Sequence, residues 1–293
     1  MKRLVAAFAA VFLCSAPVHA QTLKDFLDQA RKRWDAPTEP FRVIGNVYYV
    51  GTRGLAAYLV VGPAGHMLID TVMPGAGARI AESITKLGFK LYDVKYLVNT
   101  HAHLDHAGNF AELKQASGAQ MIAGARDKAL LESGVYPGRA DVVELQFPAV
   151  KVDRTVVDGD VVQLGFNSLV AHSTPGHSPG CTTWTLEVSE KGVDHNVIFF
   201  CSGTVALNRL VGADVTYPGI VEDYRRTLET AGSIKGDVFL APHPEMFDMD
   251  AKRAAMKPDA PNPFVRPGEF QAYVAKLKSA FDADFARQQT GKR

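Results

Sequence analysis

The sequence of 293 residues has little net charge and no long apolar run. Its formal net charge is +1, which argues against nucleic acid or an anionic membrane surface as the main partner. The apolar run at residues 4–13 is too short to span a membrane as a helix. There is no glycine-rich phosphate loop, no Gly-x-Ser-x-Gly nucleophile elbow and no low-complexity segment or short-period repeat. We therefore expect no nucleic-acid partner and no stable membrane association.

The first twenty residues have the pattern of an export signal. A basic dipeptide precedes the apolar run, and Val18-His19-Ala20 offers a small-residue cleavage site. We expect residues 1–20 to be a signal peptide and residues 21–293 to form one domain, periplasmic or secreted from a bacterium. The alternatives are a lipoprotein anchor at Cys14, whose flanking residues match such a signal poorly, and a buried N-terminal helix.

Cysteine is scarce, with three residues in the whole sequence. Only Cys181 and Cys201 remain after the expected cleavage, and an exported protein can form disulfides. Residues 182–188 and 197–201 are predicted to be consecutive strands around a turn near residue 191. A hairpin symmetric about that residue would bring the two cysteines face to face. Two free buried thiols are the alternative.

Apolar periodicity and turn residues predict strands and helices in an order that occurs twice. We expect strands at residues 41–51, 55–61, 66–70, 94–98, 119–123, 155–157, 161–164, 168–172, 182–188, 197–201 and 237–241. We expect helices at residues 23–35, 76–87, from 110 onward, 126–132, 221–231 and 268–286. This order predicts an α/β protein in which two mixed β-sheets pack face to face with helices outside them.

Residues 101–106, His-Ala-His-Leu-Asp-His, contain four potential metal ligands. In an extended segment, residues two apart point the same way, so His101 and His103 can hold one ion together. Asp105 and His106 fall where the strand gives way to a helix, and there they can turn toward a second ion. Neutral imidazoles with a carboxylate suit zinc. The alternative is four polar residues in an exposed turn.

Two further histidines follow predicted strands. His177 lies in the loop Thr-Pro-Gly-His-Ser-Pro-Gly, and His243 lies in a Pro-His-Pro turn. Three strand ends would thus deliver ligands to one edge of the sandwich, where binding sites on rigid scaffolds commonly lie. The remaining histidines of the mature chain are expected to be structural or at the surface: His66, His172 and His195.

The run at residues 101–106, with His177 and His243 in their loops, resembles the metallo-β-lactamase superfamily. The segment Val221-Glu222-Asp223-Tyr224-Arg225-Arg226 is similar to the third subclass of the class B β-lactamases. The resemblance extends over roughly residues 34–247. It implies an αβ/βα sandwich with a dinuclear zinc site in the groove between the sheets.

Transferred residue by residue, the resemblance implies two zinc ions per chain. The first would be held by His101, His103 and His177, and the second by Asp105, His106 and His243. Asp70, at the end of a predicted strand, would orient a ligand imidazole.

Residues 199–204 depart from many hydrolases of the superfamily. Glyoxalase II and the lactonases place a metal-bridging aspartate at this strand end, whereas this segment has no acid. Other class B β-lactamases place a cysteine ligand nearby, and Cys201 is one option for that role. Ser202 aligns better with the metal-facing position, and a one-residue offset reverses the side-chain face. We expect Ser202 to point inward and Cys201 away.

The resemblance implies hydrolysis of the β-lactam amide of a small-molecule substrate, because zinc activates water near neutral pH. We expect the protein to be a monomer. Asp105 would help pass a proton to the departing nitrogen. Ser202 and Thr204 would donate hydrogen bonds to the substrate carboxylate, or be ordinary strand-end hydroxyls. One alternative is a lactonase or a glyoxalase II-like thioesterase of the same fold. Another is an exported zinc-binding protein without catalysis, although structural zinc sites are usually closed.

Overall fold

A computed structural model of the chain describes residues 18–291, and only the backbone of residues 18–23 and 26. The predicted signal peptide lies outside the described residues except for its last three, with which helix α1 (Val18–Trp34) begins. Within the described part of the chain, every helix is too short or too polar to cross a membrane.

The strands form two mixed sheets. The seven-stranded sheet has the order β1-β2-β3-β4-β5-β6-β7, antiparallel up to β4 and parallel from there on. Its strands are β1 (Phe41–Ile44), β2 (Val47–Tyr49), β3 (Tyr58–Val60), β4 (His66–Ile69), β5 (Val94–Val98), β6 (Gln120–Gly124) and β7 (Arg154–Val156). The five-stranded sheet has the order β12-β11-β10-β9-β8, and only β11 and β12 are parallel. Its strands are β8 (Val161–Leu164), β9 (Asn167–Ser173), β10 (Thr182–Glu190), β11 (Val193–Phe199) and β12 (Val238–Leu240).

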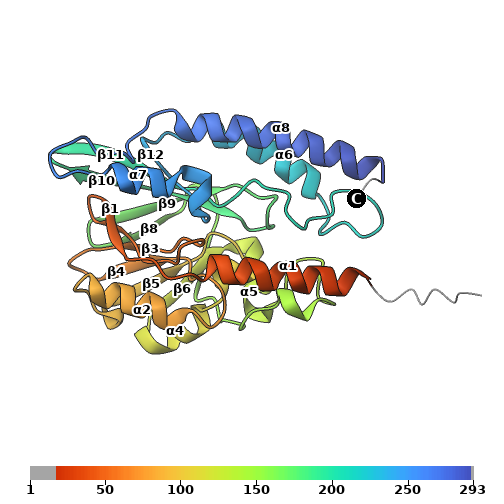
Figure 1. Cartoon of the computed structure of the whole chain (residues 1–293), viewed down its shortest axis with the longest axis horizontal. Coiled ribbons are helices and arrows are strands. Elements are labelled where there is room, and N and C mark those ends of the chain that lie inside the picture. Colours follow the sequence, from red (N-terminus) through yellow and green to blue (C-terminus); the bar gives the residue numbers. More distant parts are fainter. Residues whose placement is uncertain (1–17, 292–293) are drawn as a thin grey trace, which may run out of the picture.

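Helices cover both outer faces of the paired sheets. Figure 1 shows α2 and α4 on the side of the seven-stranded sheet, and α6 and α8 on the side of the five-stranded one. The helices after α1 are α2 (Gly77–Lys86), α3 (Leu104–Ala107), α4 (Phe110–Ser117), α5 (Lys128–Ser133), α6 (Ile220–Thr230), α7 (Met249–Ala255) and α8 (Glu269–Gln289). Short 3-10 turns lie between them: η1 (Leu91–Asp93), η2 (Ala125–Asp127), η3 (Val143–Leu145), η4 (Ala231–Ser233) and η5 (Pro244–Phe247). The predicted α/β sandwich is confirmed.

Strand β4 shows how the core is arranged. Met67 and Ile69 belong to a cluster that joins the inner faces of the two sheets, whereas Leu68 between them belongs to the cluster under α2 and α4. All three side chains are fully buried. A strand buried on both faces has a continuous apolar sequence instead of an alternating one. This burial fixes the end of β4, and with it Asp70, beside the neighbouring strand end.

Some predicted boundaries are wrong. Residues 41–51 form a hairpin, because Gly45 adopts a left-handed φ of 50° that turns the chain between β1 and β2. Strand β11 lies at 193–199 instead of 197–201, since pairing with β10 continues to the turn at Lys191 and Gly192. Helix α7 was not predicted.

Candidate metal centre

The candidate ligands gather where strands end. His101 and His103 follow β5 in an extended segment, with φ −113° and ψ 154° at His103, and helix α3 starts directly after them. His177 lies in the loop between β9 and β10, and His243 follows β12. The structure therefore brings together the strand ends that the sequence predicted to meet.

Three imidazoles form the first group. His101, His103 and His177 each offer a nitrogen, and these atoms lie within 4.8 Å of one another. Their ring centroids are 4.8 Å (His101 to His103), 4.6 Å (His101 to His177) and 4.5 Å (His103 to His177) apart. All three side chains are buried. This is a compact set of nitrogen donors on one side of a cavity.

The second group adjoins the first. Asp105 and His106 have ligand atoms within 4.8 Å of each other and of an atom of His101. Asp105 Oδ2 lies 3.3 Å from His106 Nε2 and 3.5 Å from His243 Nε2. His243 is thus joined to the group through Asp105, and its ring centroid is 5.2 Å from that of His106.

Several of these nitrogens are buried without a hydrogen-bond partner among the described residues. They are Nε2 of His101, Nε2 of His103, both ring nitrogens of His106 and Nδ1 of His243. Buried polar atoms in native proteins nearly always have a partner, and unpartnered clusters indicate an ion or water. A divalent cation supplies that partner for imidazole lone pairs and a carboxylate, so the residues fit zinc.

The protonation states suit metal binding. Burial, reinforced by neighbouring imidazoles, holds the pKa of His101 and His103 well below the usual range, and burial lowers that of His177 to about 4. These imidazoles are neutral at pH 7 and keep their lone pairs. Burial opposes ionisation of Asp105, but His106 and His243 outweigh it and hold the carboxyl pKa well below its usual range. Burial alone would lower the pKa of His106, yet Asp105 raises it overall, so a metal ion that bound this imidazole would displace a proton.

Asp70 lies directly behind the ligands. Its Oδ1 accepts the backbone N–H of Thr100 at 2.9 Å and its Oδ2 accepts the Thr100 hydroxyl at 2.6 Å. That hydroxyl lies 2.9 Å from His101 Nδ1, and Asp70 Oδ2 lies 3.8 Å from His106 Nδ1. Burial raises the pKa of Asp70 to about 6. Asp70 therefore reaches one imidazole through Thr100 and lies close to another.

A cavity of about 320 Å³ opens over the ligands. Ser202 and Thr204 line it, and their hydroxyl oxygens are 3.3 Å apart. Cys201 does not reach the ligands, because it forms a disulfide with Cys181, with the two Cα atoms 5.8 Å apart. Of the two thiol states left open by the sequence, the structure contains the disulfide.

Aromatic side chains that sequence reasoning did not assign to the site also line this cavity. The Trp34 ring at the end of α1 lies 5.3 Å from the His243 ring, and Tyr136 stacks on His103 at 4.3 Å. Leu27, which lies about two helical turns before Trp34 on α1, lines the same cavity. The apolar stripe of residues 23–35 was a signal for α1, but its periodicity could not show that the helix ends over the candidate ligand His243.

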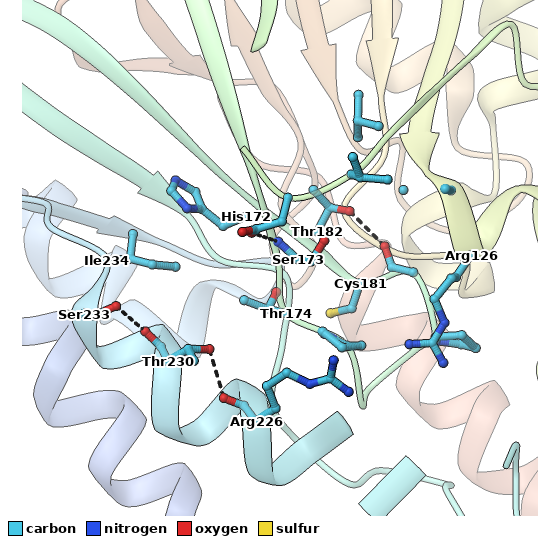
Figure 2. A pocket seen from close by; sticks show the side chains of 18 residues that line it. Arg126, His172, Ser173, Thr174, Cys181, Thr182, Arg226, Thr230, Ser233 and Ile234 are labelled. Carbon is cyan, nitrogen blue, oxygen red and sulfur yellow. Dashed lines mark hydrogen bonds between the residues drawn. The ribbon is translucent and has the colours of Figure 1, made fainter. Parts of the chain in front are cut away.

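A second cavity, of about 460 Å³, lies behind the loop that carries His177. Figure 2 shows Arg126, Cys181 and Thr182 on one side of it and the α6 side chains Arg226 and Thr230 on the other. Its lining contains none of the candidate ligands. This cavity is separate from the candidate centre.

Comparisons with known proteins agree with this geometry. The family model of the metallo-β-lactamase superfamily matches residues 50–243. The solved structure of BJP-1, a subclass B3 metallo-β-lactamase of Bradyrhizobium japonicum, is 55% identical, covers 90% of this chain and 100% of its own, and has a TM-score of 0.88.

Curated relatives match more partially. The mitochondrial persulfide dioxygenase of Bos taurus is 30% identical over 60% of this chain and 57% of its own length. The hydroxyacylglutathione hydrolase of Rhodospirillum rubrum is 31% identical over 49% of this chain and 44% of its own length. The chain thus spans about half the length of these relatives. Because the family model covers well over half of the chain and a solved structure matches along its whole length, the chain belongs to the metallo-β-lactamase superfamily, with a subclass B3 enzyme among its structural neighbours.

Proposed function

We propose that the chain is a zinc-dependent β-lactamase that hydrolyses the β-lactam amide bond. The observation that carries this proposal is the match to a subclass B3 metallo-β-lactamase at 55% identity over 100% of that chain. The buried histidine cluster beside an open cavity supports it, because a catalytic zinc site keeps a position free for water or substrate.

We assign two zinc ions to the centre. His101, His103 and His177 would hold one, and Asp105, His106 and His243 would hold the other. Bound zinc supplies Lewis acidity that activates water near neutral pH and polarises a carbonyl oxygen. The unpartnered imidazole nitrogens and the ionised Asp105 support both assignments.

Side chains of the protein would supply the proton transfer, the substrate contacts and the exclusion of water. Asp105, held ionised between His106 and His243, would help pass a proton to the departing nitrogen. The Ser202 and Thr204 hydroxyls line the cavity and would donate to the substrate carboxylate. Trp34 and Leu27 supply an apolar wall that would exclude water from the reacting groups.

A thioesterase is the second candidate, because a hydroxyacylglutathione hydrolase is among the relatives. Against it stands residue 202, where the late strand end has a serine instead of the bridging acid expected of such enzymes. A zinc-binding protein without catalysis is a weaker alternative, since the ligands face an open cavity of about 320 Å³.

We further propose that the chain is exported to the periplasm or secreted after cleavage near Ala20, and that it acts as a monomer. The sequence pattern of residues 1–20 supports export. N-terminal sequencing of the protein purified from a periplasmic fraction should begin at Gln21. Retention of Met1 there would contradict export by cleavage.

A panel of penicillins, cephalosporins and carbapenems, run beside a lactone and a thioester with and without chelator, tests the reaction. We expect turnover of β-lactams that chelator abolishes and zinc restores, and no effect of serine-directed acylating inhibitors. Efficient lactone or thioester hydrolysis with every β-lactam left intact would replace this function by the second candidate.

A further inference from the structure

The buried carboxylate of Asp127 joins the two chain segments that carry the three-histidine group. Asp127 ends the turn η2, directly after strand β6, and its side chain is fully buried. Its Oδ2 accepts the backbone N–H of Ala102 at 2.9 Å and the hydroxyl of Ser178 at 2.6 Å. Its Oδ1 accepts the backbone N–H of Gly180 at 2.6 Å. One carboxylate thus accepts three hydrogen bonds.

The positions of these donors matter more than their number. Ala102 lies between His101 and His103, and Ser178 directly follows His177. The two segments come from different halves of the fold, one after β5 and the other between β9 and β10. Asp127 therefore accepts hydrogen bonds from both of the segments that carry the three imidazoles of the first group.

Two glycines allow the backbone segments around Asp127 to pack closely against each other. A Cβ atom on Gly180 would lie 2.3 Å from the Asp127 nitrogen, and one on Gly124 would lie 2.1 Å from the Gly180 carbonyl oxygen. Real Cβ atoms do not approach so near, so glycine is required at both positions. Both glycines line the second cavity, and Figure 2 labels their neighbours Arg126, Cys181 and Thr182 among its lining side chains.

We propose that Asp127 is a positioning residue for the first metal site, which fixes His101 and His103 relative to His177. This inference rests on the proposed function, because it assigns a metal to the three-histidine group. A metal binds tightly only when its ligands are held at their binding separation, and partners behind the ligands typically change metal affinity 10- to 100-fold. Asp127 exerts this effect through the backbone and through Ser178, and it touches no ligand imidazole in the hydrogen bonds described.

Asp127→Asn tests the proposal with little change in volume. In the wild type, both carboxylate oxygens of Asp127 accept hydrogen bonds from buried donors. The asparagine side chain has only one acceptor oxygen, so its NH2 group would face one of these donors and leave it without an acceptor. We expect zinc affinity, measured by competition with a chromophoric chelator, to fall at least about tenfold. The same substitution in a His106→Ala background should show the same loss, which assigns it to the three-histidine group.

A matched control is Asp153→Asn. Asp153 Oδ2 accepts the Met121 backbone N–H of the same strand β6 at 2.8 Å, but Asp153 makes no hydrogen bond to either ligand segment. Val162→Ala, a buried core change in the edge strand β8, controls for lost stability. Both variants should keep wild-type zinc affinity within about twofold while their melting temperatures fall.

The outcomes separate the inferences. Unchanged zinc affinity in Asp127→Asn would overturn the positioning role, as would an equal loss in Val162→Ala at equal stability. A wild type that binds no zinc would overturn the metal assignment and this inference with it. If Asp127→Asn does not fold, Ser178→Ala, which removes one of the three hydrogen bonds, must weaken zinc binding by about threefold or more for the proposal to stand.

Discussion

The Nδ1 atom of His177 lies 2.7 Å from the carbonyl oxygen of Thr204. A carbonyl oxygen only accepts, so His177 must carry its proton on Nδ1, and the lone pair of Nε2 is free for a metal. The Tyr224 hydroxyl donates to the same carbonyl at 2.8 Å. The segment after β11 that carries Thr204 therefore sets both the tautomer and the orientation of a candidate ligand.

Removing a single ligand from either group should remove the metal ion of that group. We expect about two zinc ions per chain in the wild type and about one in His177→Ala and in His106→Ala, because each group then keeps too few donors. Metal analysis after exhaustive dialysis against buffer measures this. His172→Ala is the control, since His172 hydrogen bonds to Thr185 instead of facing the centre, and it should keep both ions. A wild type that saturates at one ion would contradict the dinuclear assignment.

How far the sequence could predict the structure depends on the range of the interactions involved. Strands β5 and β8 have the predicted bounds, because apolar runs between turn residues are local signals. The candidate ligands were recognised because metal-ligating residue types follow strands closely in the chain. Asp127 also follows a strand, which was a usable signal, but its role depends on contacts with Ala102 and Gly180 that only the folded chain makes.

The disulfide should stabilise the fold without taking part in metal binding. The bonded cysteines are 20 residues apart in the sequence. In the chain-entropy model, closing a loop of this length stabilises the folded state by about 3 kcal/mol. Cys181→Ala combined with Cys201→Ala should lower the melting temperature by roughly 5–10 °C and leave the zinc content unchanged. Alkylation of two thiols in the native oxidised protein would rule the bond out, and loss of zinc in the double variant would make Cys201 a ligand.

Glu190 should make stability depend on pH. Its Oε2 accepts the Gly45 N–H at 2.7 Å and its Oε1 accepts the Asn262 amide at 3.0 Å, which joins the β1–β2 turn to strand β10. Burial opposes ionisation, but these donors and Arg42 outweigh it and lower the pKa of Glu190 below 4.5. A lowered folded pKa stabilises above the unfolded pKa, and this contribution is lost as pH falls through the folded pKa.

Glu190→Gln should therefore lower the free energy of unfolding by about 1–2 kcal/mol at pH 7. The difference from wild type should shrink as pH falls below about 4.5, because the wild-type carboxylate then takes up a proton. Urea unfolding at pH 7 and pH 4 measures both effects. The exposed Glu187→Gln on the same strand should change stability by less than about 0.5 kcal/mol. A difference for Glu190→Gln that does not vary with pH would contradict a role for its charge.

The hydroxyls of Ser202 and Thr204 should serve the substrate more than the metal. Both line the cavity over the candidate ligands, and their hydroxyl oxygens lie 3.3 Å apart. Losing a hydrogen bond to a charged group costs about 1.5–3 kcal/mol, or roughly ten- to a hundredfold in kcat/KM. Ser202→Ala combined with Thr204→Ala should show that loss for β-lactams carrying the carboxylate and a smaller one for their methyl esters, with unchanged zinc content. Equal losses for acid and ester would mean that the hydroxyls do not contact the substrate carboxylate.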